Sequence, residues 1–87
     1  MKILIIEDEY SLADAIAETL KRENYIVEIK TDGEEGEDEA LTGIYDLILL
    51  DVMLPHKNGF EILKTLKSEK IETPIIMLTA SQKCQIN

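Results

Sequence analysis

Apolar residues along the chain gather in four short segments that predict β-strands. Residues 2–6 and 46–50 are almost continuously apolar, as is typical of strands buried on both faces of a parallel sheet. Residues 25–29 alternate between apolar and polar positions, which predicts a half-exposed strand near a sheet edge. A fourth strand is predicted over residues 75–78, directly after Pro74.

Between these strands the apolar positions follow a helical period. Leu12, Ile16 and Leu20 form one stripe, and Ile62, Leu63 and Leu66 form part of another. Asn24 is a plausible end for the first helix. Three pairs of residues have the spacing of helix N-caps, and they are Ser11 with Asp14, Asp32 with Glu35, and Asn58 with Glu61.

The order of the predicted elements is β-α-β-α-β-α-β, which is typical of an α/β protein with a parallel sheet. The apolar patterns indicate that the first and third strands are fully buried and that one edge is formed by the half-exposed strand over residues 25–29. We therefore expect the strand order 2-1-3-4. This is the start of a three-layer, flavodoxin-like fold.

Composition and charge narrow the function classes. The 87 residues allow one small domain, and the single cysteine, Cys84, cannot form an internal disulfide. No apolar run is long enough to span a bilayer or to form a signal peptide, so we expect a cytoplasmic protein. The net charge of −9 is concentrated in residues 1–50, whose balance is −10. Such a chain repels nucleic acid and anionic membranes, and it suits a cation or a basic partner.

Acidic and hydroxyl side chains follow the predicted strands. Glu7 and Asp8 follow the first strand, Asp51 the third and Thr79 the fourth. In a sheet of order 2-1-3-4 these residues meet where the winding direction reverses, which is where such folds bind ligands. Each residue alone equally fits a turn or a helix cap, but clustered carboxylates favour Mg²⁺ together with a phosphoryl group, one carboxylate being the acceptor.

Several motifs resemble the receiver domain of bacterial two-component response regulators. The resemblance covers about residues 1–80 and is closest to receivers that carry a C-terminal winged-helix DNA-binding domain. The matching segments are Ile3–Ile6 with Glu7-Asp8-Glu9, residues 45–55 with the run Asp51-Val52-Met53-Leu54-Pro55, Asn58-Gly59, and residues 73–80 with Leu78-Thr79-Ala80.

The resemblance implies a role for each matching residue. Asp51 would accept a phosphoryl group from a phosphohistidine of a sensor histidine kinase, Thr79 would bind that group through its hydroxyl as the switch residue, and Ala80 would offer a backbone N–H. For Mg²⁺ the implied ligands are Asp8, Asp51, the backbone carbonyl of Met53 and, through water, Glu7. Such a receiver is not a conventional enzyme, although it would catalyse its own phosphorylation and dephosphorylation. The exposed face of the first helix would dock the kinase, or would simply be solvated.

The resemblance ends after Ala80. Family members continue with a fourth helix, a fifth strand that bears a lysine, and a fifth helix, whereas residues 81–87 show neither helical nor strand periodicity. We therefore expect a truncated receiver domain over residues 1–80 and a non-matching tail over 81–87. The fourth strand would become an apolar sheet edge, which favours a homodimer.

Two alternatives to a phosphoacceptor remain open at this point. A receiver remnant without phosphotransfer could act as a protein-interaction or dimerisation module. A flavin-binding half-domain is a weaker alternative, because the acidic loop after the first strand lacks the N–H donors that an FMN phosphate needs. His56 is interpreted as a surface loop residue, and Asn58-Gly59 as residues that shape the connection after the third strand.

Overall fold

The computed structural model describes residues 1–78, which form one parallel four-stranded sheet with three helices. The strands are β1 (Lys2–Ile6), β2 (Ile26–Lys30), β3 (Leu47–Asp51) and β4 (Ile75–Leu78). Their order is β2-β1-β3-β4, and every neighbouring pair is parallel. The predicted fold class and strand order are therefore confirmed. Thr79, Ala80 and the predicted tail lie outside the described residues.

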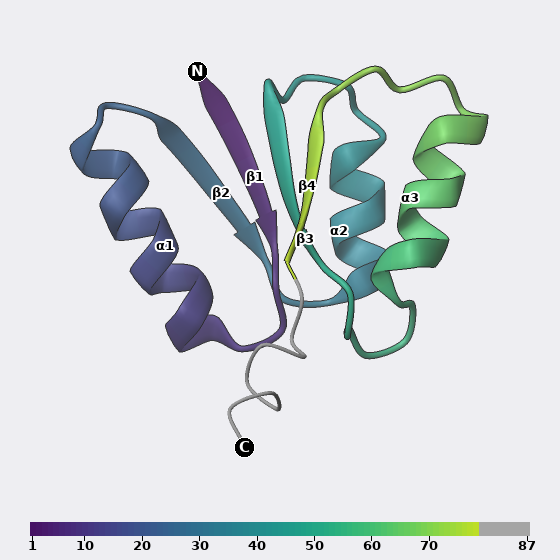
Figure 1. Ribbon diagram of the computed structural model, residues 1–87, viewed down its shortest axis with the longest axis horizontal. Helices are drawn as coiled ribbons and strands as arrows, with labels where there is room; N and C mark the ends of the chain where they lie inside the picture. The colour runs from purple at the N-terminus through teal and green to yellow at the C-terminus, as the bar shows by residue number, and fades with distance from the viewer. Residues whose placement is uncertain (79–87) are drawn as a thin grey trace.

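The helices lie on both faces of the sheet, so the protein has three layers (Figure 1). Helix α1 (Tyr10–Arg22) covers one face, whereas α2 (Gly33–Ala40) and α3 (Gly59–Ser68) cover the other. Parallel neighbouring strands need a long crossover connection, and here each connection contains one helix. Strands and helices therefore alternate along the chain.

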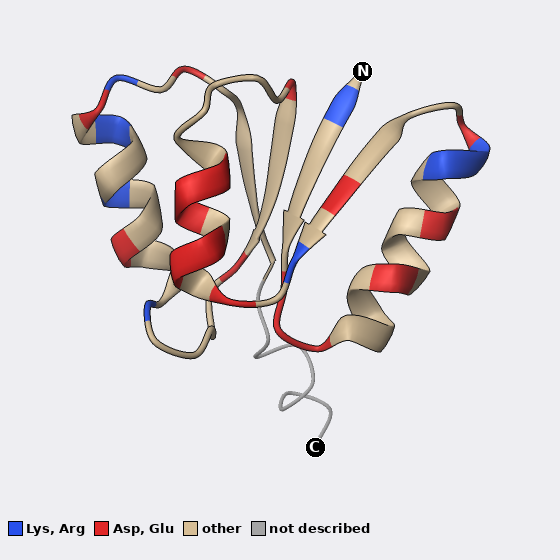
Figure 2. Cartoon of the chain, turned by 180° about the vertical axis from the view of Figure 1, so that it is seen from behind, with Lys and Arg blue, Asp and Glu red and all other residues tan. Residues whose placement is uncertain are grey.

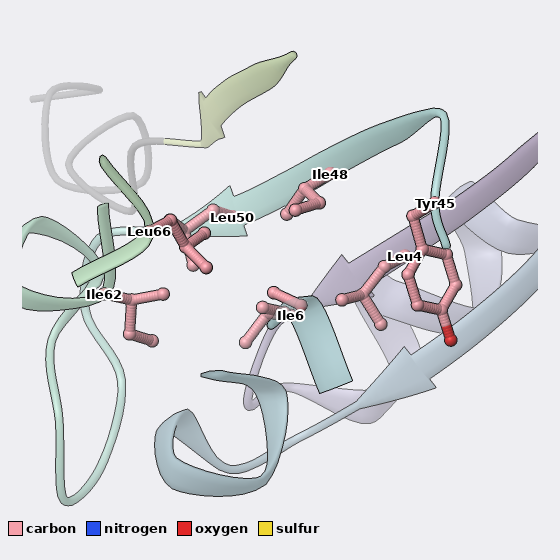
Figure 3. Packing of buried hydrophobic residues seen from close by; sticks show 8 residues of the cluster. Leu4, Ile6, Tyr45, Ile48, Leu50, Ile62 and Leu66 are labelled. Carbon is pink, nitrogen blue, oxygen red and sulfur yellow. The ribbon is translucent and has the colours of Figure 1, made fainter. Parts of the chain in front are cut away.

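Two apolar cores hold the layers together, one on each face of the sheet. Beneath α2 and α3, alternate residues of β1 and β3 pack against Ile62 and Leu66 of α3, both fully buried (Figure 3). On the α1 face, Ile3 and Ile5 pack against Ala13 and Ala17. Burying a side chain such as Ile62 contributes about 1.5–3 kcal/mol to stability. Both faces of β1 are therefore buried, as its continuous apolar run predicts.

The helix starts test the predicted caps. Asp32 accepts hydrogen bonds from the backbone N–H groups of Glu34 and Glu35, and Asn58 forms a reciprocal capping box with Glu61. Both predictions are confirmed. The prediction for Ser11 is wrong, because helix α1 begins earlier, at Tyr10. The backbone N–H groups of residues 12 and 13 already donate to the carbonyl of residue 9, which leaves Ser11 inside the first turn.

Strands β2 and β3 are each shifted by one residue from the predicted ranges 25–29 and 46–50. Strand β2 starts at Ile26 and runs to Lys30, and β3 runs to Asp51. Asp51 belongs to the strand because it is paired with Leu78 in the β3–β4 ladder. This places the Asp51 carboxylate on the rigid end of a strand rather than in the loop that follows. Within residues 1–78, no helix has the length and apolar character needed to cross a membrane.

Candidate metal and phosphoryl site

Three carboxylates meet at the carboxyl edge of the sheet. Oxygen atoms of Glu7, Asp8 and Asp51 all lie within 4.8 Å of one another. Glu7 and Asp51 are only 2% exposed, whereas Asp8 is exposed to solvent. The cluster therefore has two buried members and one member at the surface, which is the arrangement of a shallow site with a solvent-facing side.

The sheet register explains this meeting of residues far apart in sequence. Ile6 of β1 is paired with Leu50 of β3, so the residues that follow them, Glu7 and Asp51, emerge side by side. The backbone N–H of Glu7 still donates to the carbonyl of Lys30, at 3.0 Å, which continues the contact with β2. The backbone hydrogen bonds of the sheet therefore fix the positions of both residues that carry the buried carboxylates.

Backbone N–H groups orient the two buried carboxylates. Glu7 Oε2 accepts a hydrogen bond from the N–H of Glu9 at 3.0 Å, and Asp51 Oδ1 accepts one from the N–H of Met53 at 3.2 Å. Each bond turns a carboxylate back toward its own chain. Each carboxylate has further acceptor positions besides this bond, and those can serve a cation or a phosphoryl donor.

Gly59 allows the loop after β3 to return close to Asp51. Its N–H donates to the carbonyl of Val52 at 2.8 Å. A Cβ at this position would lie 2.3 Å from the carbonyl oxygen of Asp51 and 2.9 Å from Cα of Val52. Both are backbone atoms that cannot move aside, so any larger residue would displace the strand end that carries Asp51.

Burial and mutual repulsion perturb the acidity of the cluster. Burial, together with the negative charges of Asp51 and Asp8, raises the pKa of Glu7 to about 7, against the opposing hydrogen bond from Glu9. Burial also raises the pKa of Asp51, with a further contribution from Asp8. Crowded carboxylates that resist ionisation gain most from a bound cation, because it replaces the missing countercharge.

The donor atoms of the cluster fit a hard divalent cation. All are carboxylate oxygens, which Mg²⁺ prefers, and the exposed side leaves space for the water ligands that Mg²⁺ retains. The distribution of charge also favours a cation at this edge of the sheet. Acidic residues gather on α2 and in the loop after β1, whereas most Lys and Arg lie toward the C-terminal ends of α1 and α3 (Figure 2). The three carboxylates are therefore chemically suited to hold Mg²⁺.

An open pocket adjoins the cluster. It has a volume of about 530 Å³ and is lined by Asp8, Met53, Leu54, Pro55 and Asn58. Met53 is 64% exposed, and its neighbours on the loop contribute apolar surface. The pocket therefore leaves space for a small molecule beside Asp8, along the loop between β3 and α3.

The structure brings most of the predicted site residues together. Glu7, Asp8 and Asp51 form the cluster, and the Met53 side chain lines the pocket beside it. Thr79 and Ala80 lie outside the described part of the chain, so their roles stay predictions. Sequence reasoning missed one feature, a contact between the His56 side chain and Asp32. No spacing rule reveals it, because the two residues are 24 positions apart and on different elements.

Comparison with known proteins gives the family. The model of the response regulator receiver domain matches residues 3–87, almost the entire chain. The chain belongs to the response regulator receiver family. The matched residues include the acidic cluster and the helix caps at Asp32 and Asn58. This is the family that the sequence motifs resemble.

Two curated relatives are similar to this receiver. It is 46% identical over 83 residues to the transcriptional regulatory protein DltR of Streptococcus agalactiae, covering 95% of this chain and 37% of that protein. It is 52% identical over 79 residues to the response regulator ArlR of Staphylococcus saprophyticus, covering 91% of this chain and 36% of the relative. The receiver thus spans little more than a third of the length of these relatives.

A solved structure adds a metal-bound comparison. The response regulator TrrA of Thermotoga maritima, solved in complex with Mg²⁺-BeF, is 31% identical with a TM-score of 0.85. The alignment covers 97% of this receiver and 73% of the TrrA chain. The parallel sheet of order 2-1-3-4 and its three helices therefore match a known receiver fold.

Proposed function

We propose that this receiver accepts a phosphoryl group on Asp51 from a phosphohistidine of a sensor histidine kinase, with Mg²⁺ as cofactor. Asp51 is the proposed acceptor because it ends β3, is held by the Met53 N–H and adjoins the open pocket. One observation carries the proposal, namely the meeting of Glu7, Asp8 and Asp51 within 4.8 Å at one edge of the sheet.

The proposed metal ligands are carboxylate oxygens of Asp8 and Asp51, the backbone carbonyl of Met53 and, through water, Glu7. Bound Mg²⁺ would neutralise the charge that accumulates as phosphoryl oxygens approach three carboxylates. The fit rests on the all-oxygen donor set and on the raised pKa of Glu7 and Asp51. The complex of the similar receiver TrrA with Mg²⁺-BeF also supports it.

In the proposed transfer, a carboxylate oxygen of Asp51 attacks the phosphorus of the phosphohistidine. An O–P bond forms, the N–P bond breaks, and the imidazole leaves with the electron pair of that bond. The strand and the Met53 N–H hold the attacking carboxylate in place, so little orientation remains to be found in the transition state. Thr79 and Ala80 are proposed to bind the transferred phosphoryl group. Water attack on the acyl phosphate would reverse the modification, so the receiver would catalyse its own phosphorylation and dephosphorylation.

Phosphorylation by a small acyl phosphate tests this proposal without a known kinase. With Mg²⁺ present, intact mass spectrometry should show the addition of one phosphoryl group. Asp51→Asn should abolish the adduct, and the matched variant Asp38→Asn, which changes a carboxylate on α2 away from the cluster, should retain it. Equal labelling of the Asp51 variant would refute the assignment.

A second candidate function is an interaction or dimerisation module that does not require phosphotransfer. Within residues 1–78, β4 is the last strand of the sheet, and its Ile76 is 52% exposed. Beside it, between α3 and β4, lies a groove of about 540 Å³ lined by Leu63, Ile71 and Met77 among others. We propose that this side pairs with a second copy of the chain. We also propose a cytoplasmic protein. Its net charge of −9 supports the proposal that this chain does not itself bind nucleic acid or anionic membranes.

A further inference from the structure

The loop between β3 and α3 is tied to helix α2 by two side-chain contacts. His56 Nδ1 contacts Asp32 Oδ1 at the N-terminus of α2. One residue further, Lys57 Nζ donates to Glu37 Oε1 at 3.0 Å. The two loop residues are consecutive, and their partners lie on successive turns of α2, so the pairs form two neighbouring tethers.

The backbone of the loop at His56 and Lys57 is strained, and it lies in close contact with the start of α2. His56 has a φ of 68°, and the N–H of Lys57 donates to the carbonyl of Pro55 at 2.7 Å. This is a three-residue γ-turn with positive φ, a conformation that is rare and costs energy. A Cβ on Gly33 would lie 2.3 Å from the carbonyl oxygen of Lys57. The tip of the loop therefore holds a strained shape directly against the first residue of α2.

The other end of the same loop reaches the acidic cluster. Met53, three residues before His56, donates its N–H to Asp51 Oδ1 at 3.2 Å. Val52 accepts the Gly59 N–H at 2.8 Å, which closes the base of the loop. With its base and tip both fixed, the loop has little freedom at Met53, whose carbonyl is a proposed metal ligand.

We propose that the pair of His56 and Asp32 is a positioning device, which fixes the β3–α3 loop and makes Mg²⁺ binding tighter when His56 is protonated. This inference rests on the proposed function, because it assigns the loop to the magnesium site. His56 is not one of the proposed metal ligands, and its side chain contacts Asp32 rather than the acidic cluster.

The charges around His56 give the direction of the pH effect. The hydrogen bond to Asp32, the charge of Asp32 and that of Glu34 raise the pKa of His56, and His56 in turn lowers the pKa of Asp32. On the loop side the next charge, Lys57, is paired with Glu37. The ion pair is complete above the pKa of Asp32, and it is lost as the pH rises through the raised pKa of His56. Since the His56 side chain is 68% exposed, a change of only about two- to fivefold in Mg²⁺ affinity is expected.

The test compares Mg²⁺ affinity of the wild type and His56→Asn by calorimetry at about pH 6 and pH 8. Asn accepts positive φ, so the variant keeps the turn but has no titrating side chain. At each pH we take the ratio of the wild-type affinity to the His56→Asn affinity. Glu7 titrates in both proteins, so its effect on Mg²⁺ binding cancels in this ratio. Near pH 6 the wild type should bind Mg²⁺ about two- to fivefold more tightly than His56→Asn does. Near pH 8 the two proteins should bind Mg²⁺ equally tightly. Asp32→Asn, which still caps α2, should behave like His56→Asn.

Two further measurements separate positioning from simple stabilisation. By NMR, the pKa of His56 should rise when Mg²⁺ saturates the site, because the coupling between the two events is reciprocal. Lys64→Asn, which removes one positive charge from α3, should leave the affinity ratio unchanged. An affinity ratio independent of pH, or a His56 pKa that Mg²⁺ leaves unchanged or lowers, would overturn the positioning role. Failure of the wild type to bind Mg²⁺ at all would instead overturn the proposed function and this inference with it.

Discussion

The carboxylates of Glu7 and Asp51 lie side by side beneath the protein surface, each only 2% exposed, at the ends of neighbouring strands. Neither is neutralised by a lysine or arginine in the ion pairs of residues 1–78. Burying two like charges together costs free energy, which a well-packed core must offset. The site is thus built at the expense of stability, and its properties should respond to pH, metal and substitution.

Glu7 should make the metal-free protein less stable as the pH rises. Its pKa is about 7 in the folded protein and 4.5 ordinarily. Between these values the folded state holds a proton that the unfolded state releases, so the free energy of unfolding should fall as the pH rises from about 4.5 to 7. Glu7→Gln should remove this decline and stabilise the protein by about 1–3 kcal/mol at neutral pH. Urea unfolding across this pH range measures the effect, and a decline of equal size in the variant would contradict it.

Mg²⁺ should stabilise the folded protein and release protons on binding. A concentration ten times the dissociation constant should add about 1.4 kcal/mol to the free energy of unfolding. Below neutral pH, binding must displace the proton held by Glu7, so the measured heat should depend on the ionisation enthalpy of the buffer. Thermal unfolding and calorimetry in two buffers test this. Asp38→Asn should respond like the wild type, whereas Asp51→Asn should lose most of the stabilisation.

Gly59→Ala should damage both the fold and the site. The new Cβ would lie 2.3 Å from the Asp51 carbonyl oxygen, so the backbone at the end of β3 must shift. We expect a loss of about 2–4 kcal/mol in stability and weaker Mg²⁺ binding. Gly43→Asn is the control. A Cβ on Gly43 would lie 4.0 Å from Ile71 Cδ1, an ordinary contact distance, and Asn tolerates the φ of 72° at this position. Equal stability of the two variants would show that the close approach is unimportant.

The side of the sheet at β4 should decide the oligomeric state. Ile76→Lys places a charge on an exposed apolar residue of the strand and should dissociate a dimer formed there. Ile44→Lys changes an isoleucine of similar exposure, 53%, in the loop before β3 and should leave the dimer intact. Sedimentation velocity distinguishes the outcomes. A wild-type protein that is monomeric at high concentration would exclude the proposed pairing.

The sequence predicts the fold well because each signal is local or periodic. The continuous apolar runs of β1 and β3 match their buried places, and the alternation over residues 25–29 matches the edge position of β2. The caps at Asp32 and Asn58 were predictable because a capping side chain and its partners lie within three residues. The start of α1 was missed because the backbone carbonyl of residue 9, rather than a short polar side chain, opens the helix.

The sheet order allowed the acidic cluster to be predicted, but not the contacts of the β3–α3 loop. Placing β1 beside β3 brings Glu7, Asp8 and Asp51 to one edge, and the structure brings these residues together. The tether between His56 and Asp32 depends on how the β3–α3 loop folds against α2, which no periodicity specifies. The positive φ of His56 could not be predicted either, since turn rules assign that conformation chiefly to Gly, Asn and Asp.

We propose that Asp51 carries the phosphoryl group, and chemical trapping tests this directly. After reaction with an acyl phosphate and Mg²⁺, reduction with borohydride converts a phosphoaspartate to homoserine, which peptide mapping locates by mass. We expect homoserine at position 51 and nowhere else, with none formed when Mg²⁺ is removed by chelation. Homoserine at another carboxylate, or unmodified Asp51 in protein that has gained a phosphoryl group, would contradict it.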